Sequence, residues 1–152
     1  MQNLIIKQDI LFLREVKEND TKLLFNWAND MHVRKNAINQ DTITWEKHII
    51  WFEKKMNSSK TQMFILSDGN NSFGQIRIDE IDSVWHIDYS IDYNYRGQGL
   101  GTQIVNLLLK KFKTFKFKAT VKKYNEASSS VFIKLGFKQL LINDPDFAFF
   151  EY

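Results

Sequence analysis

The hydrophobic and polar positions of this 152-residue chain repeat with two different periods, and the period separates predicted helices from predicted strands. Apolar residues three or four positions apart predict helices at about 20–30, 45–57, 104–112 and 126–135. Short apolar or alternating runs predict strands at 9–16, 62–67, 73–81, 84–91, 115–121, 137–142 and 147–152. The polar stretch 31–42 shows neither period and is predicted to be irregular.

The order of these elements indicates the fold class. It reads β-α-α-β-β-β-α-β-α-β-β, which is typical of an α/β domain (α+β with a mixed sheet) in which helices cover one sheet. The chain has 1 proline and no repeat or low-complexity tract, so nothing marks an internal linker. We therefore expect residues 1–152 to form a single domain, within the usual domain size of about 100 to 200 residues.

Composition narrows the class of protein. Hydrophobic residues make up 43% and charged residues 26%, so the chain can bury a core and is expected to be soluble. The lack of cysteine excludes disulfides, cysteine-ligated zinc and a thiol nucleophile, and the 3 scattered histidines show no metal-ligand spacing. A charged N-terminal region, without a run of about 18 apolar residues, argues against a signal peptide and a membrane span. We expect a cytoplasmic protein without a bound metal or a membrane partner.

The charge is distributed unevenly along the chain. The net charge is +3, but residues 110–138 contain nine lysines and one acid, which gives 9 − 1 = +8 and leaves −5 elsewhere. Such a field attracts a phosphorylated small molecule or a nucleic acid, unless the lysines form only a solvated face. Phe112, Phe115 and Phe117 lie among the lysines, but their helical and strand periodicity favours burial over base stacking. We therefore expect no nucleic-acid partner.

The segment 84–102 is the most informative part of the sequence. A predicted strand leads into three alternate glycines, Gly97, Gly99 and Gly101, at the start of a predicted helix. Glycines allow a tight turn and a close approach of the backbone, and the first amides of a helix attract negative charge. The spacing G-x-G-x-G fits neither the Rossmann fingerprint nor the Walker loop. The segment predicts an anion site of another kind.

Two motifs carry a resemblance to a known family. Arg96-x-x-Gly99-x-Gly101 resembles the pyrophosphate loop of the GNAT superfamily of N-acetyltransferases, and 125–137 (NEASSSVFIKLGF) resembles the acyl-CoA-contacting helix of that superfamily. The element order agrees with the same fold over nearly all 152 residues. The resemblance implies an enzyme that moves the acetyl group of acetyl-CoA to a primary amine by direct attack in a ternary complex. It also implies that strands 84–91 and 115–121 splay apart around the thioester.

The resemblance further implies which residues contact acetyl-CoA. The diphosphate lies on the amides of 96–102, the pantetheine arm pairs with strand 84–91, and Asn125 contacts the arm or caps its helix. The implied cofactor-binding residues are Tyr89, Ser90, Ile91, Arg96, Gly97, Gln98, Gly99, Leu100, Gly101, Thr102, Asn125, Ser128 and Phe132. Lys122, Lys123 and Lys134 are candidates for the 3′-phosphate, or solvated lysines.

Acetyl transfer needs a deprotonated amine, a donor for the developing oxyanion and a proton for the leaving thiolate. The resemblance implies a backbone amide near Tyr89 or Ile91 as the oxyanion donor. Strand alternation places His86, Asp88 and Ser90 on one face, so Asp88 is the first candidate for the general base and His86 the second. Hydrogen bonds to neighbouring loops are the alternative for both side chains.

The sequence departs from the family pattern at Phe132. Many relatives carry a tyrosine there, which is placed to protonate the thiolate, and phenylalanine has no proton to give. Ser128 and Ser129 lie one turn earlier on the same predicted helix and are candidate acids, as is Tyr124. Water is the remaining alternative, because the unperturbed pKa of a thiol is only about 8.5.

The acceptor site is expected within 24–52, where aromatic rings alternate with amides and an arginine, a composition that suits a polar, hydroxyl-bearing acceptor. The candidate acceptor-binding residues are Trp27, Asn29, Arg34, Asn39 and His48. Core packing is the alternative for the tryptophans, and a structural role is the alternative for His48.

The pattern of this segment is similar to that of members that acetylate amino groups of nucleotide-linked sugars. Acetylation of protein N-termini or of aminoglycosides, and binding of acyl-CoA without turnover, are the alternatives. Homodimers are common in the superfamily, and the Phe-rich end 147–152 is a candidate interface.

Overall fold

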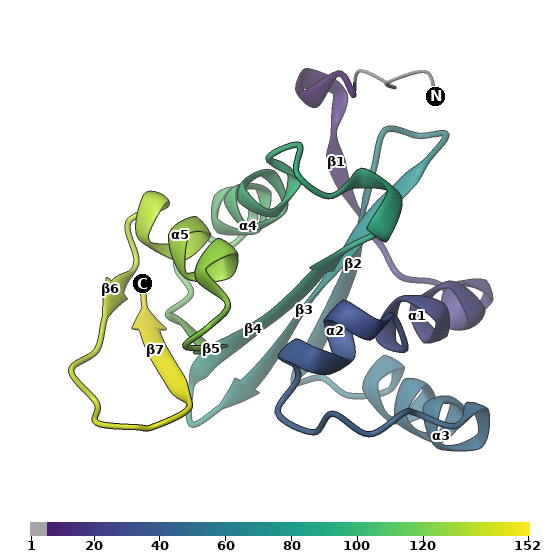
Figure 1. Ribbon diagram of the computed structural model, residues 1–152. Helices are drawn as coiled ribbons and strands as arrows, with labels where there is room; N and C mark the ends of the chain where they lie inside the picture. The colour runs from purple at the N-terminus through teal and green to yellow at the C-terminus, as the bar shows by residue number, and fades with distance from the viewer. Residues whose placement is uncertain (1–5) are drawn as a thin grey trace.

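The computed structural model describes residues 6–152 and contains one seven-stranded mixed sheet, drawn in Figure 1. The strand order across the sheet is β1-β2-β3-β4-β5-β7-β6. The strands are β1 (Phe12–Glu15), β2 (Thr61–Ser67), β3 (Ser72–Ile81), β4 (Val84–Ile91), β5 (Phe117–Lys122), β6 (Lys138–Gln139) and β7 (Phe147–Glu151). The α/β fold class expected from the element order is confirmed.

Helices cover both faces of the sheet (Figure 1). The first group is α1 (Thr21–Ala28), α2 (Met31–Asn36) and α3 (Trp45–Met56), and the second is α4 (Leu100–Lys111) and α5 (Glu126–Lys134). The described part of the chain also contains three short 3-10 helices, η1 (Gln8–Ile10), η2 (Glu18–Asp20) and η3 (Tyr93–Tyr95). The period-three-to-four spacing of apolar residues in α3 and α4 explains why each buries one side against the sheet.

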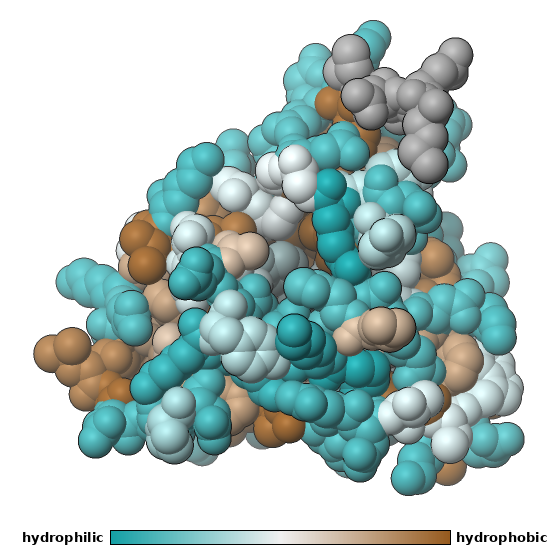
Figure 2. All heavy atoms as spheres, viewed as in Figure 1, coloured by the Kyte–Doolittle hydropathy of each residue, from teal (hydrophilic) through white to brown (hydrophobic). Residues whose placement is uncertain are grey.

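Each face of the sheet has its own hydrophobic core. The larger core packs residues of α4 and α5, such as Ile104, Leu108 and Phe132, against the central strands. The smaller core joins α1 and α3 to β2 through residues that include Leu24, Trp27, Phe52 and Ile65. Hydrophilic side chains cover most of the surface seen in Figure 2, and hydrophobic surface gathers over the loop between β6 and β7. Leu141 and Ile142 of that loop are exposed.

Strand β4 pairs with β3 along its whole length but with β5 only near its start. Its antiparallel pairing with β3 runs without a bulge from Gly74 opposite Ile91 to Ile81 opposite Val84. Its parallel pairing with β5 consists of only two residue pairs, Trp85 with Phe117 and His86 with Lys118. Beyond these pairs the two strands diverge, which confirms the expected splay.

Two predicted elements differ in the structure. The segment 31–42 was expected to be irregular but contains α2, because Asp30 accepts hydrogen bonds from the NH groups of His32 and Val33 and caps a helix that buries no residue. The strand expected at 137–142 shrinks to the two residues of β6, because only Lys138 and Gln139 find register partners on β7. The other elements lie where the sequence predicts them, with shifted ends.

None of the helices within residues 6–152 combines the length and the apolar character that crossing a bilayer requires.

Candidate active site

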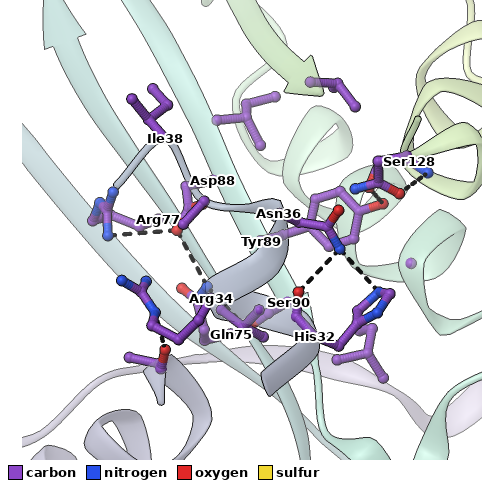
Figure 3. A pocket seen from close by; sticks show the side chains of 18 of the residues that line it. His32, Arg34, Asn36, Ile38, Gln75, Arg77, Asp88, Tyr89, Ser90 and Ser128 are labelled. Carbon is purple, nitrogen blue, oxygen red and sulfur yellow. Dashed lines mark hydrogen bonds and ion pairs between the residues drawn. The ribbon is translucent and has the colours of Figure 1, made fainter. Parts of the chain in front are cut away.

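A cavity of about 1100 Å³ lies where β4 and β5 diverge (Figure 3). Its walls come from β3, β4 and β5, from α1, α2, α3 and the loop between α2 and α3, and from α5 and the first turn of α4. The cavity therefore touches both the segment expected to bind acetyl-CoA and the segment expected to bind the acceptor.

The glycine loop, residues 96–101, presents unpaired amides to this cavity. Gly97 and Gly99 both have a φ of +77°, a left-handed conformation that strains other residues. Within residues 6–152, no hydrogen-bond acceptor is found for the NH groups of 97–102, and the first amide that is paired belongs to Gln103, which donates to the Gly99 carbonyl at 3.2 Å. Free amides at the N-terminus of a twelve-residue helix attract negative charge, so the geometry is compatible with the predicted anion site.

Gly101 allows α4 to approach β4 closely. A Cβ atom at this position would lie 3.3 Å from Cε2 and 3.4 Å from the hydroxyl of Tyr89. The loop is also held from outside, because the Gln8 side chain donates to the Gln98 carbonyl at 2.8 Å. The free amides are thus part of a fixed loop. Leu100 and Thr102 line the cavity beside Gly101, whereas Gln98 does not.

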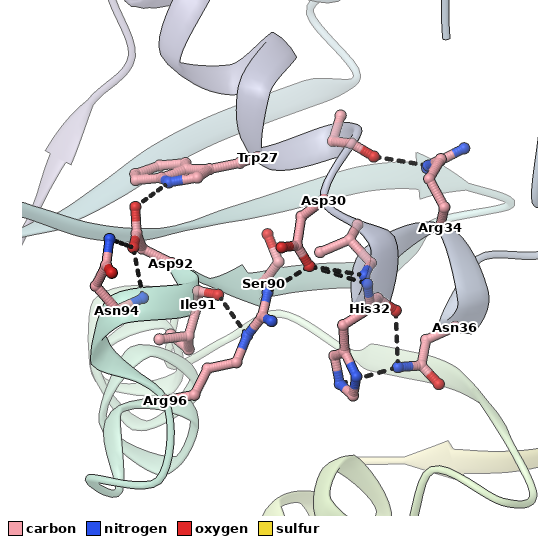
Figure 4. A network of polar contacts seen from close by, with 12 residues as sticks. Trp27, Asp30, His32, Arg34, Asn36, Ser90, Ile91, Asp92, Asn94 and Arg96 are labelled. Carbon is pink, nitrogen blue, oxygen red and sulfur yellow. Dashed lines mark hydrogen bonds and ion pairs between the residues drawn. The ribbon is translucent and has the colours of Figure 1, made fainter. Parts of the chain in front are cut away.

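Arg96 connects the glycine loop to α2, as Figure 4 shows. Its Nε donates to the Ile91 carbonyl at 3.0 Å and its Nη2 to Asp30 at 2.8 Å. Burial of the Asp30 carboxylate works to raise its pKa, but the hydrogen bonds from Arg96 and from the amides of Val33 and His32 hold the pKa below its usual value. The Arg96 guanidinium is therefore engaged with protein groups, and its predicted contact with the diphosphate stays a prediction.

The open edge of β4 supplies further unpaired amides. The Trp85 NH donates to the Lys116 carbonyl at 2.8 Å, so the NH groups of alternate residues along β4 point toward β5. Pairing with β5 ends at His86. The NH groups of Tyr89 and Ile91 lie on the same side beyond that point and face the gap. This is where the sequence expects the oxyanion donor.

The face of β4 toward α1–α3 forms a polar floor, and Asp88 lies in its middle (Figure 3). The Asp88 carboxylate is 3.5 Å from a guanidinium nitrogen of Arg77 and 3.4 Å from Nε2 of Gln75, and 56% of its side chain is exposed. Ser90 accepts from the same Gln75 amide at 3.3 Å, and His86 stands opposite Asp79 in the strand register. Both candidate bases line the cavity. Their roles stay predictions.

The polar residues that β3 contributes to this floor were missed by the sequence reasoning. Gln75, Arg77 and Asp79 alternate with the buried Ile76 and Ile78. Asp79 binds Lys55 at 2.6 Å and Arg77 at 2.8 Å, so this carboxylate is already neutralised by cations. The period-two pattern of 75–79 is a signal that could have identified them.

Helix α5 forms the opposite wall of the cavity. Asn125 caps α5, because its side chain accepts a hydrogen bond from the Ser128 NH at 3.3 Å. The interpretation of Asn125 as a helix cap is therefore confirmed, and its contact with acetyl-CoA stays a prediction. The Ser128 hydroxyl lies 3.0 Å from the Tyr89 hydroxyl. Phe132 is 2% exposed and packs edge-on against the Tyr89 ring, with centroids 5.9 Å apart.

Two candidate acids, and two of the three candidate lysines for the 3′-phosphate, do not line the cavity. Ser129 and Tyr124 do not line the cavity, and the Tyr124 hydroxyl donates to the Lys35 carbonyl of α2. Among the three candidate lysines for the 3′-phosphate, Lys122 lines the cavity and the Lys123 ammonium donates to the Asp144 carbonyl. Lys134 is exposed on α5.

The predicted acceptor residues separate into two groups. Arg34 and Asn39 line the cavity, and Arg34 donates to the carbonyls of Ala28, Asn39 and Asp41, which holds the loop after α2 in place. Trp27 and Asn29 do not line the cavity. Trp27 is buried and donates to Asp92 at 2.7 Å, and Asn29 exchanges two hydrogen bonds with the backbone of Ile43.

His48 has a structural contact. It borders the cavity but is only 2% exposed, and its Nε2 lies 2.8 Å from the Thr21 carbonyl, so α3 is joined to α1. Burial lowers the pKa of His48 below its usual value, and the hydrogen bond to Thr21 only partly opposes this. These contacts fit a structural role for His48, which is the alternative to acceptor binding.

Within residues 6–152 no group of three or more His, Asp or Glu side chains is arranged to hold a metal ion.

Comparison with known proteins identifies the family. The family model of the acetyltransferase (GNAT) domain matches residues 11–138. No curated protein sequence matches the chain.

Solved structures show the same fold. The spermidine N-acetyltransferase from Vibrio cholerae, in complex with CoA and spermine, superposes with a TM-score of 0.84 at 17% identity, over 95% of each chain. An aminoglycoside acetyltransferase, AAC(6')-Ib, in complex with coenzyme A, gives 0.78 at 19% identity, over 93% of this chain and 94% of that one. The Salmonella typhimurium acetyltransferase that modifies the N-terminal serine of ribosomal protein L7/L12 gives 0.77 at 16% identity, over 93% and 94%.

Proposed function

Because the chain belongs to the GNAT acetyltransferase family, we propose that it transfers an acetyl group to the primary amine of a nucleotide-linked amino sugar, by direct attack in a ternary complex. The chain is an acetyl-CoA-dependent acetyltransferase. The finer parts of the proposal are the acceptor, the order of bond formation and the residues that move protons. A cytoplasmic location and a homodimer belong to the same proposal.

One observation carries the proposal, namely the unpaired amides of 97–102 beside the gap between β4 and β5. Unpaired NH groups at a helix N-terminus fit a diphosphate, and the open edge of β4 fits an extended arm with amide groups of its own. The residues present therefore fit acetyl-CoA, which supplies an activated acetyl thioester when bound.

The chain's own groups perform the remaining chemistry. The NH groups of Tyr89 and Ile91 face the gap and stabilise negative charge on the acetyl oxygen. Asp88, exposed in the cavity beside them, takes a proton from the acceptor's ammonium group directly or through water, with His86 as the second candidate. Gln75 and Arg77 hold the Asp88 carboxylate at the cavity floor.

The lining of the cavity favours a neutral or anionic acceptor with many hydroxyl groups. Asp79 is neutralised by Lys55 and Arg77, and Arg77 also faces Asp88. Three carboxylates line the cavity (Asp41, Asp79 and Asp88) against five cationic side chains (Arg34, Lys47, Arg77, Arg96 and Lys122), so the lining lacks the surplus of carboxylates that a polyamine would need. The amides of Gln75, Asn36 and Asn39 line the same space and suit the hydroxyl groups of a sugar.

Two measurements test the proposal. Acetyl-CoA is expected to raise the melting temperature of the protein, since a ligand that binds only the folded state stabilises it. Thiol release is then measured with a nucleotide-linked amino sugar, an aminoglycoside, spermidine and a peptide with an N-terminal serine. Turnover only with another amine overturns the sugar acceptor. Stabilisation without turnover on any amine identifies a binding module, and a lack of stabilisation contradicts the whole proposal.

A further inference from the structure

The proposed reaction leaves a thiolate that needs a proton, and the helix that faces it offers none at the expected position. Phe132 is 2% exposed and fills the core between Phe137, Phe150 and Tyr89. The two alternative donors outside the cavity, Ser129 and Tyr124, do not line the space where the thiolate forms. A donor on another element would have to reach the gap between β4 and β5.

Tyr89 is a phenol in that position. Its NH faces the gap, and its side chain crosses to the α4–α5 side of the sheet. The hydroxyl lies 3.0 Å from the Ser128 hydroxyl, and it would lie 3.4 Å from a Cβ on Gly101. The ring packs edge-on against Phe132. The phenol therefore lies at the junction of β4, α4 and α5, in the lining of the cavity.

We propose that the Tyr89 hydroxyl donates the proton to the leaving sulfur and that Ser128 is the hydrogen-bond partner that positions and reprotonates it. This inference rests on the proposed function. It assigns the acid to a strand residue, and it explains how the chain works with phenylalanine at 132. In this proposal Ser128 acts through its hydrogen bond to Tyr89 and is therefore a positioning residue.

The atoms and charges balance. The amine nitrogen bonds to the acetyl carbon, the carbon–sulfur bond breaks, and its electron pair stays on sulfur. Tyr89 gives its hydroxyl proton to that sulfur. The ammonium group loses two protons when it becomes an amide. One leaves through Asp88 to solvent, and the other replaces, through solvent and Ser128, the proton that Tyr89 donated.

The environment of Tyr89 keeps its proton in place until it is needed. Burial raises the pKa of the phenol above its usual value, the hydrogen bond to Ser128 partly opposes this, and the negative charge of Asp88 adds to the rise. The groups that face the ring from α4 and α5 are Gly101, Ser128 and Phe132, none of which titrates. The phenol is therefore protonated throughout the neutral range.

The first experiment compares Tyr89→Phe with Tyr152→Phe. Both substitutions remove one phenolic oxygen and keep the ring. Tyr152 packs against Phe137 with centroids 4.9 Å apart and does not line the cavity. We expect kcat to fall about 100-fold in Tyr89→Phe, the lower range for loss of a general acid, with an unchanged dissociation constant for acetyl-CoA. Tyr152→Phe should match the wild type.

The second experiment does not depend on turnover. The ultraviolet absorbance of the thiolate of bound CoA is followed as the pH rises. A hydrogen bond from Tyr89 stabilises the thiolate, so the thiol of bound CoA should ionise at a lower pH in the wild type than in Tyr89→Phe. Ser128→Ala keeps the donor but loses its partner, and we expect an intermediate titration and a smaller loss of kcat.

The outcomes separate this inference from the proposed function. If Tyr89→Phe folds, binds acetyl-CoA, and has the kcat and the thiol titration of the wild type, Tyr89 is not the acid although acetyl transfer stands. A loss of acetyl-CoA affinity in Tyr89→Phe, with kcat unchanged, would assign the phenol to binding and overturn the inference as well. If the wild type does not bind acetyl-CoA, the proposed function has failed first.

Discussion

Asp88 is the residue on which the proposed deprotonation depends. It projects from the middle of the open strand β4, and its side chain is 56% exposed in the cavity. Asp88→Asn keeps the shape and the hydrogen bond with Gln75 but cannot accept a proton. We expect the acetylation rate at neutral pH to fall about 100-fold or more, with little change in acetyl-CoA affinity, measured by thiol release and by calorimetry.

A matched control is available on α3. Glu53 is exposed on the outer side of that helix and does not line the cavity, so Glu53→Gln removes one carboxylate and should keep the rate of the wild type. If Asp88→Asn has an unchanged pH–rate profile, the base is another group, with His86 next in order.

At the residue scale, the sequence predicts which face a side chain occupies when the residues concerned belong to one strand, because the alternation of that strand fixes the face. Alternation along β4 suffices to place Asp88 and His86 on one face. The partners of Asp88 were not predictable from β4 alone, because Gln75 and Arg77 reach it across the sheet. Their approach depends on the β3–β4 register, which the tertiary pairing sets.

The glycine loop is the element whose backbone shape matters most. Gly97 and Gly69 make a matched pair, because both have positive φ, at +77° and +97°, and a Cβ atom added to either would meet no other atom within 4 Å. Replacing either with alanine should cost about 1–2 kcal/mol of unfolding free energy through backbone strain. Only Gly97→Ala should also weaken acetyl-CoA binding, because only it distorts the free amides.

The measurement combines denaturant unfolding with titration of acetyl-CoA. An equal loss of acetyl-CoA affinity in Gly69→Ala would mean that general destabilisation, and not the amide geometry of the glycine loop, controls binding. Unchanged affinity in Gly97→Ala would remove the loop from the binding site.

Helices α1 and α3 are joined by a titratable contact. The buried imidazole of His48 meets the Thr21 carbonyl, and its pKa lies below the usual 6.5. When the pH falls below about 6.5, the unfolded chain binds a proton that the folded chain rejects. The free energy of unfolding should therefore fall as the pH drops through this window and level off below the folded-state pKa.

A His48→Gln variant can still donate to Thr21 but does not titrate. It should be less stable at pH 7 through altered packing, and its unfolding free energy should vary less between about pH 7 and 5.5. His32→Gln, at an exposed position of α2, removes another histidine and is measured beside it as the control. Equal slopes in all three proteins would contradict the assignment.

At the element scale, the sequence predicts elements that bury an apolar face and fails where no face is buried. Helix α2 has no buried residue, so no periodicity indicates it, and it forms because Asp30 caps it and Arg96 holds Asp30. Its place over the cavity depends on contacts with residues far along the chain, such as Arg96, which is 66 positions from Asp30. Such contacts follow from the fold and leave no local pattern.

At the scale of the whole molecule, positive charge is concentrated in the segment 110–138 and the rest of the chain is negative. The excess of +8 in 110–138 falls on α4, β5 and α5 and their loops, and the remaining −5 on the rest of the chain. Counting charges along the sequence predicts this division. It does not predict that Lys122 lines the cavity while Lys134 is exposed on the outer side of α5, because that depends on how β5 and α5 pack.

This uneven charge predicts that the affinity for acetyl-CoA depends on salt concentration through the phosphate groups of the donor and not through its acetyl-pantetheine part. Acetyl-CoA carries several phosphate charges, so its dissociation constant should rise severalfold as the salt concentration increases from about 0.02 M to about 0.3 M, where the screening length falls below about 10 Å. Acetyl-pantetheine lacks the phosphates, and its weaker binding should vary little. Lys122→Gln should reduce the slope for acetyl-CoA more than Lys134→Gln does, because only Lys122 borders the cavity. Equal salt slopes for the two donors would show that the lysine-rich segment 110–138 does not lie near the phosphates of bound acetyl-CoA.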